Sequence, residues 1–388
     1  MNVMFSLNNT IVPPHNMNST EVRHNSLPVL HVRGSYYEVG YNVGRTFCGL
    51  IKTLLDTHPS LNKVYIPLYN TNNGREIYDK TYQTVMKYYP QYIREMEGMS
   101  DGAGVPFYKL FLLHLDDILP VCVGKMNQTN GCHGCSTVCL NEEHAEMIGH
   151  TEDALKEVLN NIYIVKAHIT ESQPEEIFTA FCYAGLLPGY AMGFNNHGLI
   201  YSINIIGAKH LGKGKLPRAF VARALLTASS LETVEDILRC KGCGIGDAMS
   251  VNLTFLNQQG DRLFHNIEVS PTFPISDESA LSVMTISPGE VMFHANKFLR
   301  LQIPELEGDM KDSSTARHET MKKHTIINNK CVLNLLGDTT HKKYDIFRSV
   351  ENVWTVAVGI FDCLARTWSI YLDNPKLSDP IAVLPLDY

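Results

Sequence analysis

The chain has 388 residues, of which 44% are hydrophobic and 19% charged, and its formal net charge is −7. This composition is that of a globular protein with a large core, and the length suits two domains or one large one. No basic excess indicates nucleic-acid binding. No run of about 18 apolar residues predicts a membrane span, and no basic segment marks a signal peptide. We therefore expect a cytoplasmic protein with neither a nucleic-acid nor a membrane partner.

The first third of the chain is predicted to be mainly helical. Residues 1–26 are rich in Asn, Ser and Pro without periodicity, which predicts a mobile tail. A short strand is predicted at residues 27–32. Apolar residues at helical spacing predict three helices, at residues 35–55 with Ser35 as N-cap, at 75–99, and at 107–119, where Pro120 ends the last one.

After residue 134 the pattern changes to short β-type runs separated by turn signals. Four hairpins are predicted, formed by residues 136–140 with 146–150, 191–194 with 199–204, 251–256 with 262–268, and 353–362 with 367–372. Helices are predicted between them at residues 217–229, 231–239 and 313–328. Runs of strands combined with runs of helices indicate an α+β fold of layered sheets and helices.

A cysteine cluster at residues 131–139 lies where a polar loop becomes a strand. One interpretation is a zinc site, in which Cys132-x-x-Cys135 and Cys240-x-x-Cys243 supply four thiolates. The two pairs lie more than a hundred residues apart, whereas the pairs of a zinc ribbon are usually separated by roughly 15–20 residues. A second interpretation is that these cysteines are small buried hydrophobic residues, which leaves the Gly-Cys-Ser-Thr sequence at a loop-to-strand junction unexplained.

A third interpretation makes Cys135 a nucleophile that attacks the carbonyl of Gly134. Glycine tolerates the strained geometry of an N-to-S acyl shift. Hydrolysis of the resulting thioester frees an α-amine on Cys135, which titrates near about 7.7–8.0 and accepts a proton at neutral pH. Nucleophile and general base then belong to one residue. This interpretation predicts that the chain cleaves its own Gly134–Cys135 bond.

Several short motifs, each weak alone, occur in an order that is hard to obtain by chance. They are Arg-Gly-Ser-Tyr-Tyr-Glu-Val-Gly at 33–40, Gly-Cys-Ser-Thr at 134–137, Gly-His-Thr-Glu-Asp at 149–153, Gly-Phe-Asn-Asn-His-Gly-Leu at 193–199, Ile-Glu-Val-Ser-Pro at 267–271 and His-Ala-Asn at 294–296. In these motifs the chain resembles the acyl-coenzyme A:6-aminopenicillanic acid acyltransferase family, a cysteine group of the N-terminal-nucleophile hydrolases. The likeness extends from about residue 29 to 375.

This resemblance implies an αββα sandwich, in which two stacked sheets lie between helical layers. It implies that the precursor divides into an α fragment, helical over residues 27–134, and a β fragment, residues 135–388, which begins with the nucleophile. The two fragments would stay associated as one structural unit. We expect a small-molecule amide substrate, no cofactor and no metal ion, and we leave open the assembly of a homo-oligomer.

The resemblance also implies roles for individual residues. Cys135 matches the nucleophile, and Asp153 matches an acid beside it that orients the amine or assists cleavage. Asn296 matches an oxyanion-hole donor, whose removal costs about 2.7–4 kcal/mol in other enzymes. Arg348 matches a basic residue that lines the substrate pocket. The structural alternatives are a solvated acid at a helix start for Asp153, a turn asparagine for Asn296, and a surface ion pair for Arg348.

One departure from the family concerns the charge of the substrate. Where the penicillin-pathway enzyme has Asn-x-Arg-x-Glu, this chain has His114-Leu115-Asp116-Asp117. Carboxylates in place of an arginine suit a cationic ligand such as the ammonium of β-alanine. The alternative is that Asp116 and Asp117 bind the cleavage loop or a helix terminus.

Within the family, the likeness is greatest to insect members that hydrolyse β-alanyl amides of biogenic amines. The implied reactions convert β-alanyl-dopamine to dopamine and β-alanyl-histamine to histamine. A second possibility is an acyltransferase that passes the acyl group from the Cys135 thioester to an amine or thiol. A third is a non-catalytic protein that binds zinc through the two cysteine pairs.

Overall fold

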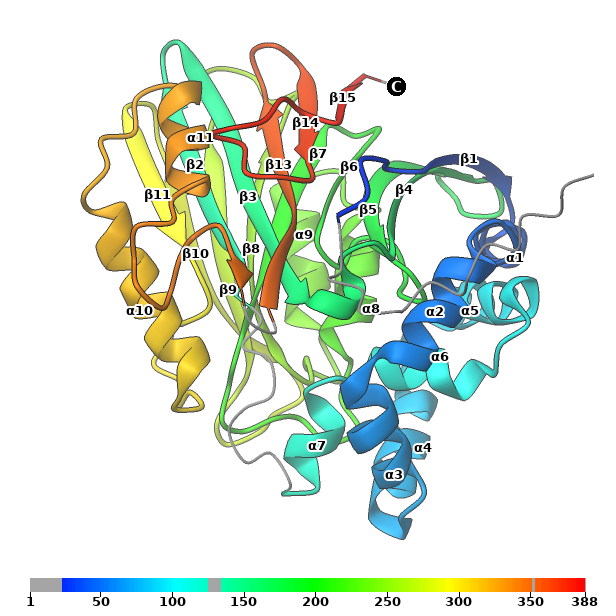
Figure 1. Ribbon diagram of the computed structural model, residues 1–388. Helices are drawn as coiled ribbons and strands as arrows, with labels where there is room; N and C mark the ends of the chain where they lie inside the picture. Colours follow the sequence, from blue (N-terminus) through cyan, green and yellow to red (C-terminus); the bar gives the residue numbers. More distant parts are fainter. Residues whose placement is uncertain (1–22, 125–133, 351–352, 388) are drawn as a thin grey trace, which may run out of the picture.

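The computed structural model describes residues 23–124, 134–350 and 353–387. Its N-terminal part is a single strand followed by helices (Figure 1). The elements are β1 (Val29–Gly34), α1 (Tyr36–Thr46), α2 (Cys48–Thr57), the π-helix η1 (Leu61–Tyr65), α3 (Ile66–Tyr69), α4 (Asn72–Tyr88), α5 (Pro90–Ala103), α6 (Phe107–Leu113) and α7 (Ile118–Cys122). Of the predicted tail, residues 1–22 lie outside the described residues, and Arg23 packs its guanidinium over the Trp354 ring.

The predicted helix at residues 35–55 is two helices. Ser35 caps α1 as predicted, because its side chain accepts from the Glu38 backbone while the Glu38 side chain binds the Ser35 backbone. The helix ends at Thr46, however, and α2 begins at Cys48. Phe47, between them, stacks on Tyr163 with ring centroids 3.9 Å apart. This tertiary contact does not change the helical spacing of apolar residues, so the sequence did not predict the break.

The other two predicted helices are also divided, and at the first of them a proline explains the division. Residues 75–99 belong to α4 and α5, which separate at Tyr89, because Pro90 has no N–H and restricts the backbone of the residue before it. Residues 107–119 belong to α6 and α7. Pro120 lies in the first turn of α7 and not at a helix end, since a proline there removes an N–H that has no helical acceptor.

The C-terminal part contains most of the strands. Its strands are β2 (Ser136–Glu142), β3 (Ala145–Leu155), β4 (Ile162–Ile169), β5 (Glu176–Tyr183), β6 (Met192–Asn195), β7 (Leu199–Ile206), β8 (Ala248–Phe255), β9 (Phe264–Pro271), β10 (Ser279–Ile286), β11 (Glu290–His294), β12 (Ser349–Val350), β13 (Val353–Asp362), β14 (Thr367–Tyr371) and β15 (Ala382–Pro385). Its helices are the 3-10 helix η2 (Lys156–Val158), α8 (Arg218–Leu225), α9 (Leu231–Arg239), α10 (Asp309–Met321) and α11 (Asn329–Leu336).

The four predicted hairpins are confirmed. They are the antiparallel pairs β2–β3, β6–β7, β8–β9 and β13–β14. The helix predicted at residues 231–239 is α9, whereas the one predicted at 313–328 starts earlier and ends at Met321. Strands β4 and β5 were not predicted, because they are buried on both faces and carry no clean alternation of polar and apolar residues.

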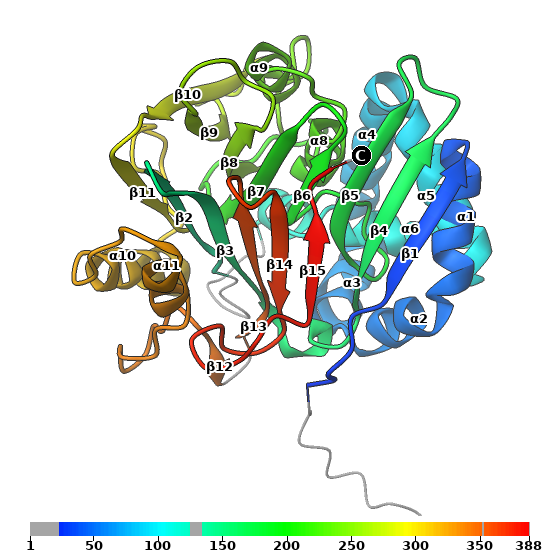
Figure 2. The ribbon, with the colours of Figure 1, turned by 90° about the horizontal axis from the view of Figure 1, so that it is seen from above.

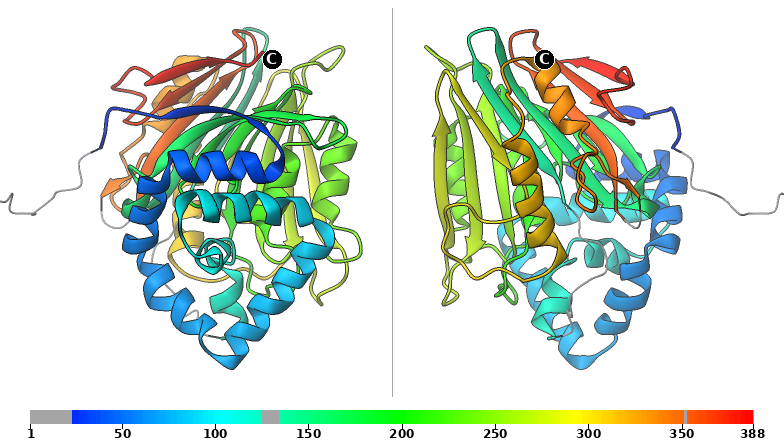
Figure 3. Two further views of the ribbon diagram at one scale, coloured as in Figure 1. Left: turned by 90° about the vertical axis from the view of Figure 1, so that its right-hand side faces the viewer. Right: turned by 60° about the vertical axis from the view of Figure 1, so that its left-hand side comes forward.

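The described strands form two sheets (Figure 2). One has the order β1-β4-β5-β6-β7-β8-β9-β10, and the other has the order β11-β2-β3-β13-β14-β15 with β12 paired to β13. The sheets face each other, since Thr137 on β2 hydrogen-bonds Asn204 on β7, and Trp368 on β14 packs edge-on against Phe194 on β6. Helices α10 and α11 lie outside the second sheet and α1, α5 and α8 outside the first (Figures 2 and 3). This arrangement confirms the prediction of an α+β fold.

No helix in the described parts of the chain combines the length and the hydrophobicity that crossing a membrane requires. One hydrophobic core lies between the sheets and under the helices of the first sheet. A second core packs α11 against the second sheet. Strand β2 lies within the second sheet, between β11 and β3, and begins immediately after Cys135. The fold therefore holds the residue at the predicted cleavage point at the start of a paired strand.

Glycines allow helices α1 and α5 to cross at very short distance. A Cβ added to Gly40 of α1 would lie 1.8 Å from the Glu95 carbonyl oxygen of α5. A Cβ added to Gly98 of α5 would lie 2.1 Å from the Tyr37 carbonyl oxygen of α1. Both contacts are with backbone, which cannot move aside as a side chain can.

We predict that Gly40→Ala lowers the midpoint of thermal unfolding, because overpacking of this kind typically costs about 1–3 kcal/mol or more. The matched control is Gly49→Ala in α2, where an added Cβ meets nothing within 4 Å. There, the higher helix propensity of alanine should leave stability unchanged or raise it by up to about 1 kcal/mol. Equal unfolding midpoints for the two variants would show that the helices separate at little cost.

Candidate active site

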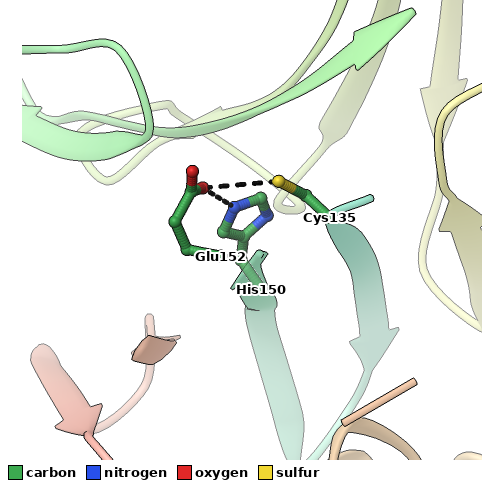
Figure 4. A group of neighbouring side chains, drawn as sticks. All are labelled: Cys135, His150 and Glu152. Atoms are coloured by element: carbon green, nitrogen blue, oxygen red, sulfur yellow. Dashed lines mark hydrogen bonds and ion pairs between the residues drawn. The ribbon is translucent and has the colours of Figure 1, made fainter. Parts of the chain in front are cut away.

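Cys135 is buried, with 4% of its surface exposed, and directly precedes strand β2. Strand β2 pairs with β3 so that Ser136 lies opposite Thr151. The next residues of β3, Glu152 and Asp153, therefore lie beside Cys135. The Cys135 thiol donates to Glu152 Oε2 over 3.6 Å (Figure 4).

Glu152 is the centre of a buried network that sequence analysis did not assign. Its Oε2 lies 2.8 Å from His150 Nε2, and its Oε1 accepts a hydrogen bond from the Tyr183 hydroxyl. The other ring nitrogen of His150, Nδ1, lies 2.7 Å from Thr137 Oγ1. The Gly-His-Thr-Glu-Asp motif pointed to this strand, but it gave no reason to assign a role to any of its residues except Asp153.

The thiol of Cys135 is held in its protonated form in the uncut chain. Burial, together with the carboxyl groups of Glu152 and Asp153, raises the pKa of Cys135 well above its usual value. Attack by this sulfur therefore requires an acceptor for its proton. Glu152 lies at hydrogen-bonding distance for that purpose.

Asp153 is a buried acid within strand β3, so the alternative of a solvated acid at a helix start is wrong. Its Oδ1 accepts a 2.6 Å hydrogen bond from Thr355 Oγ1 of β13. Burial raises the pKa of Asp153 to about 6, against the opposing effects of Arg348 and Arg317. The Asp153 carboxyl thus lies near two positive charges. It is the neighbour in sequence of Glu152, which accepts the hydrogen bond from the Cys135 thiol.

Arg317 of α10 is the main residue that sequence analysis missed. It is fully buried, and its Nη1 donates to the Gly134 oxygen over 2.8 Å and to the Cys135 oxygen over 2.7 Å. The carbonyl of the predicted cleavage bond is therefore bound by a guanidinium group. An arginine on a helix without apolar periodicity gives no signal in a single sequence.

Gly134 is fitted against the same guanidinium group. A Cβ added to this residue would lie 2.7 Å from Arg317 Nη2 and 3.3 Å from Asn296 Oδ1. A side chain at position 134 would displace the group that binds its own carbonyl. The packing of Gly134 against Arg317 therefore favours glycine before Cys135.

Asn296 lies at the site but does not bind the Gly134 carbonyl in the uncut chain. Its Oδ1 accepts a 2.6 Å hydrogen bond from Arg317 Nη2, and its Nδ2 donates to the Ile205 oxygen over 2.9 Å. Its backbone N–H donates to Ser314 Oγ. The residue is thus buried and hydrogen-bonded through its backbone N–H and through both polar atoms of its side chain, and Arg317 binds the Gly134 oxygen.

The loop that carries Asn296 is fixed by Glu268 of β9. The Glu268 carboxyl accepts hydrogen bonds from the backbone of Leu299 and Leu301 and lies 3.1 Å from His294 Nε2. Burial acts to raise the pKa of Glu268, but these hydrogen bonds outweigh it and lower the pKa to about 2. A firmly ionised carboxylate therefore holds the loop in place.

Arg348 is buried, and its charge acts on Asp153. Its Nη2 donates to Ser313 Oγ over 3.2 Å, and the same oxygen accepts from Arg317 Nε over 3.2 Å. Ser313 therefore connects the two arginines that flank Asp153. The structure thus brings Gly134, Cys135, Asp153, Asn296 and Arg348 together at one site.

Asp116 and Asp117 belong to a separate cluster around Arg218. Arg218 Nη2 lies 2.9 Å from Asp116 Oδ2 and 2.7 Å from Asp117 Oδ2, and Arg218 Nη1 lies 3.2 Å from Asp247 Oδ2. Tyr190 donates to Asp116 over 3.0 Å. The two aspartates are therefore bonded to a buried arginine of the chain itself, and this cluster fixes the α6–α7 junction to α8.

Two groups of described residues could bring three metal ligands together. They are Cys135 with His150 and Glu152, and Asp116 with Asp117 and Asp247. Cys240 and Cys243 belong to neither group, and Cys240 donates to the Ile237 oxygen at the end of α9. Cys132 lies outside the described residues. The arrangement therefore gives no support to a zinc ribbon built on Cys135.

The family model of acyl-coenzyme A:6-aminopenicillanic acid acyl-transferase matches residues 139–377, which is more than half of the chain. The chain belongs to this family. It is also 42% identical over 379 residues to the β-alanyl-dopamine/carcinine hydrolase of Drosophila melanogaster, with 94% of this chain and 98% of that relative covered. The resemblance inferred from the ordered motifs is confirmed.

Proposed function

We propose that the chain is a self-cleaving cysteine amidohydrolase that releases β-alanine from β-alanyl amides of biogenic amines. The observation that carries the chemistry is the Gly134–Cys135 junction, where a buried thiol has a carboxyl acceptor and the adjacent carbonyl is bound by Arg317. The near-full-length similarity to the β-alanyl-dopamine/carcinine hydrolase supports the substrate class. The products would be dopamine from β-alanyl-dopamine and histamine from carcinine, which is β-alanyl-histamine.

Self-cleavage would begin with attack of Cys135 Sγ on the Gly134 carbonyl carbon. Glu152 takes the thiol proton, and Arg317 stabilises the oxyanion of the tetrahedral intermediate. The C–N bond then breaks, the new α-amine of Cys135 receives the proton, and a thioester links Gly134 to Sγ. Water hydrolyses this thioester to a Gly134 carboxylate and a free thiol.

The two fragments, residues 1–134 and 135–388, would stay together after cleavage. Strand β1 of the first fragment pairs with β4 of the second over six residues. Buried Arg223 joins Glu95 of the first fragment to Glu176 of the second over 2.9 and 3.0 Å. These contacts, and two facing sheets with helices outside them, support the αββα sandwich of N-terminal-nucleophile hydrolases.

In turnover, the same thiol would attack the amide carbonyl of the substrate. The α-amine of Cys135 takes the thiol proton and returns it to the leaving amine, and Asp153 orients that α-amine. Water then hydrolyses the acyl-thioester and releases β-alanine. Asn296 and Arg317 bind the oxyanion, and Arg348 lines the site. These steps use water and groups of the chain itself, without a metal ion or cofactor. We place the reaction in the cytoplasm.

We predict that Cys135→Ala abolishes both maturation and activity. Wild-type protein should run as two fragments on a denaturing gel, with one fragment beginning at Cys135, and should release β-alanine from β-alanyl-dopamine and from carcinine. Cys135→Ala protein should remain one chain and release none. Cys139→Ala, which removes a buried thiol from the same strand, should still mature. Cleavage of the Cys135→Ala chain at residue 134 would contradict the assignment of the nucleophile.

We predict that Arg317→Lys slows cleavage of the Gly134–Cys135 bond by about 10²–10³-fold, the usual effect of removing one oxyanion donor. A lysine ammonium retains the charge but cannot bind the Gly134 oxygen and Asn296 together as the planar guanidinium does. Arg239→Lys is the matched control, because Arg239 lies at the end of α9 and its Nη2 is 3.6 Å from Glu235 Oε2 of the same helix. The measurement is the fraction of uncut chain with time after synthesis.

The alternative is an acyltransferase, which the name of the family favours. Both reactions share the acyl-Cys135 thioester, so the discriminating measurement is its partition between water and a second amine. We expect β-alanyl-dopamine with excess histamine to give β-alanine as the main product. Accumulation of β-alanyl-histamine in place of β-alanine would instead assign the chain to acyl transfer.

A further inference from the structure

Substrate recognition sets a distance requirement that one residue of the site meets. This inference rests on the proposed function. In a β-alanyl amide, the ammonium nitrogen lies three bonds from the carbonyl carbon, a span of about 3.8 Å. The carbonyl carbon itself must approach the attacking sulfur to about 3–3.5 Å. The approach of sulfur to carbon, the span of the acyl group and an ammonium hydrogen bond of about 2.7–2.9 Å together place the binding group at most about 10 Å from Cys135 Sγ.

We propose that Glu152 binds this ammonium and so selects acyl groups with an amine at the β-carbon. Its Oε2 is 3.6 Å from Cys135 Sγ. An ammonium that donates to Oε2 over about 2.7–2.9 Å can keep its carbonyl carbon in position for attack by that sulfur. Glu152 is also 4% exposed, so the interaction would form away from bulk water, where charge pairing is strongest.

The surroundings of the two adjacent acids separate their roles. Asp153 accepts a hydrogen bond from Thr355 Oγ1 over 2.6 Å, and the positive charges of Arg348 and Arg317 act to lower its pKa. Glu152 is instead bonded to a thiol, a phenol hydroxyl and an imidazole ring. The Tyr183 hydroxyl fixes Oε1, which leaves Oε2 directed toward the sulfur (Figure 4). A cationic substrate supplies the charge that complements this carboxyl.

The aspartates suggested by the sequence are less well placed for this role. Asp116 and Asp117 are bonded to Arg218. Asp116 is connected to Glu152 through the rings of Tyr190 and Tyr183, whose centroids alone are 6.3 Å apart.

The proposal is tested by shortening the side chain at position 152 and lengthening the acyl group of the substrate by one methylene each. Glu152→Asp shortens the side chain by one methylene and retains the carboxyl, so the best acyl group should become one methylene longer. The substrates are the dopamine amides of β-alanine, of γ-aminobutyrate, and of propionate, which lacks the ammonium. Dopamine release gives kcat/KM for each, and ratios within one protein cancel differences in the amount of mature enzyme.

Wild-type protein should prefer the β-alanyl amide to both others. Glu152→Asp should shift the ratio of γ-aminobutyryl to β-alanyl hydrolysis by about tenfold or more, which corresponds to about 1.4 kcal/mol. Glu152→Gln should lose the preference of β-alanyl over propionyl. Tyr183→Phe removes the hydroxyl that binds Glu152 Oε1. It should reduce the preference for β-alanyl over propionyl amides while propionyl hydrolysis is retained. This variant tests the proposal if the Glu152 variants do not undergo cleavage.

Two further variants complete the experiment. Glu146→Gln makes the same substitution on strand β3, at a residue bonded to Arg262, and should keep the wild-type ratios. Asp116→Asn should keep them too. Wild-type ratios in Glu152→Asp and Tyr183→Phe, or loss of the preference in Asp116→Asn alone, would overturn the proposal while the proposed function stands. Failure of the wild-type protein to hydrolyse any β-alanyl amide would instead reject the proposed function itself.

Discussion

The buried guanidinium of Arg317 is the interaction on which the site depends. It binds the carbonyl oxygens of both Gly134 and Cys135 and the side chains of Asn296 and Ser313. A buried arginine without acceptors would cost several kcal/mol, so these groups are held together by the need to satisfy it. Arg317 lies on α10, which packs outside the second sheet (Figure 2). Arg317 therefore fixes the start of β2 to a helix that is distant in the sequence.

Two neighbouring acids on one strand illustrate how the environment assigns roles. Glu152 and Asp153 are consecutive and both buried, but β-strand alternation directs their side chains to opposite sides. One meets a thiol and a phenol, and the other meets two arginines and the Thr355 hydroxyl. A pair of acids in contrasting surroundings is the arrangement by which enzymes divide proton transfer from charge stabilisation or binding.

The sequence predicted the features that depend on short-range patterns and on the order of motifs along the chain. The α+β class, the four hairpins and the Ser35 cap follow from short-range patterns, and the family followed from ordered motifs. The breaks at Phe47 and around Pro120 depend on tertiary contacts or on the position of a proline within a helical turn. Arg317 lies 183 residues from Gly134, and no periodicity within a single sequence encodes a contact of that kind.

The uncut chain also constrains how the finished enzyme binds its substrate. In the proposed self-cleavage, Gly134 would be the first acyl group presented to Cys135, and its carbonyl oxygen lies 2.8 Å from Arg317 Nη1, within the range of an oxyanion donor. Any later acyl group attacked by the same sulfur must place its oxygen near the same donor. Glycine has no side chain beyond its Cα, so it makes no demand on the space toward Glu152. On the proposal that Glu152 binds the substrate ammonium, an acyl group with a β-ammonium does make that demand. One arrangement of oxyanion donors would then serve both an unselective first reaction and a selective second one.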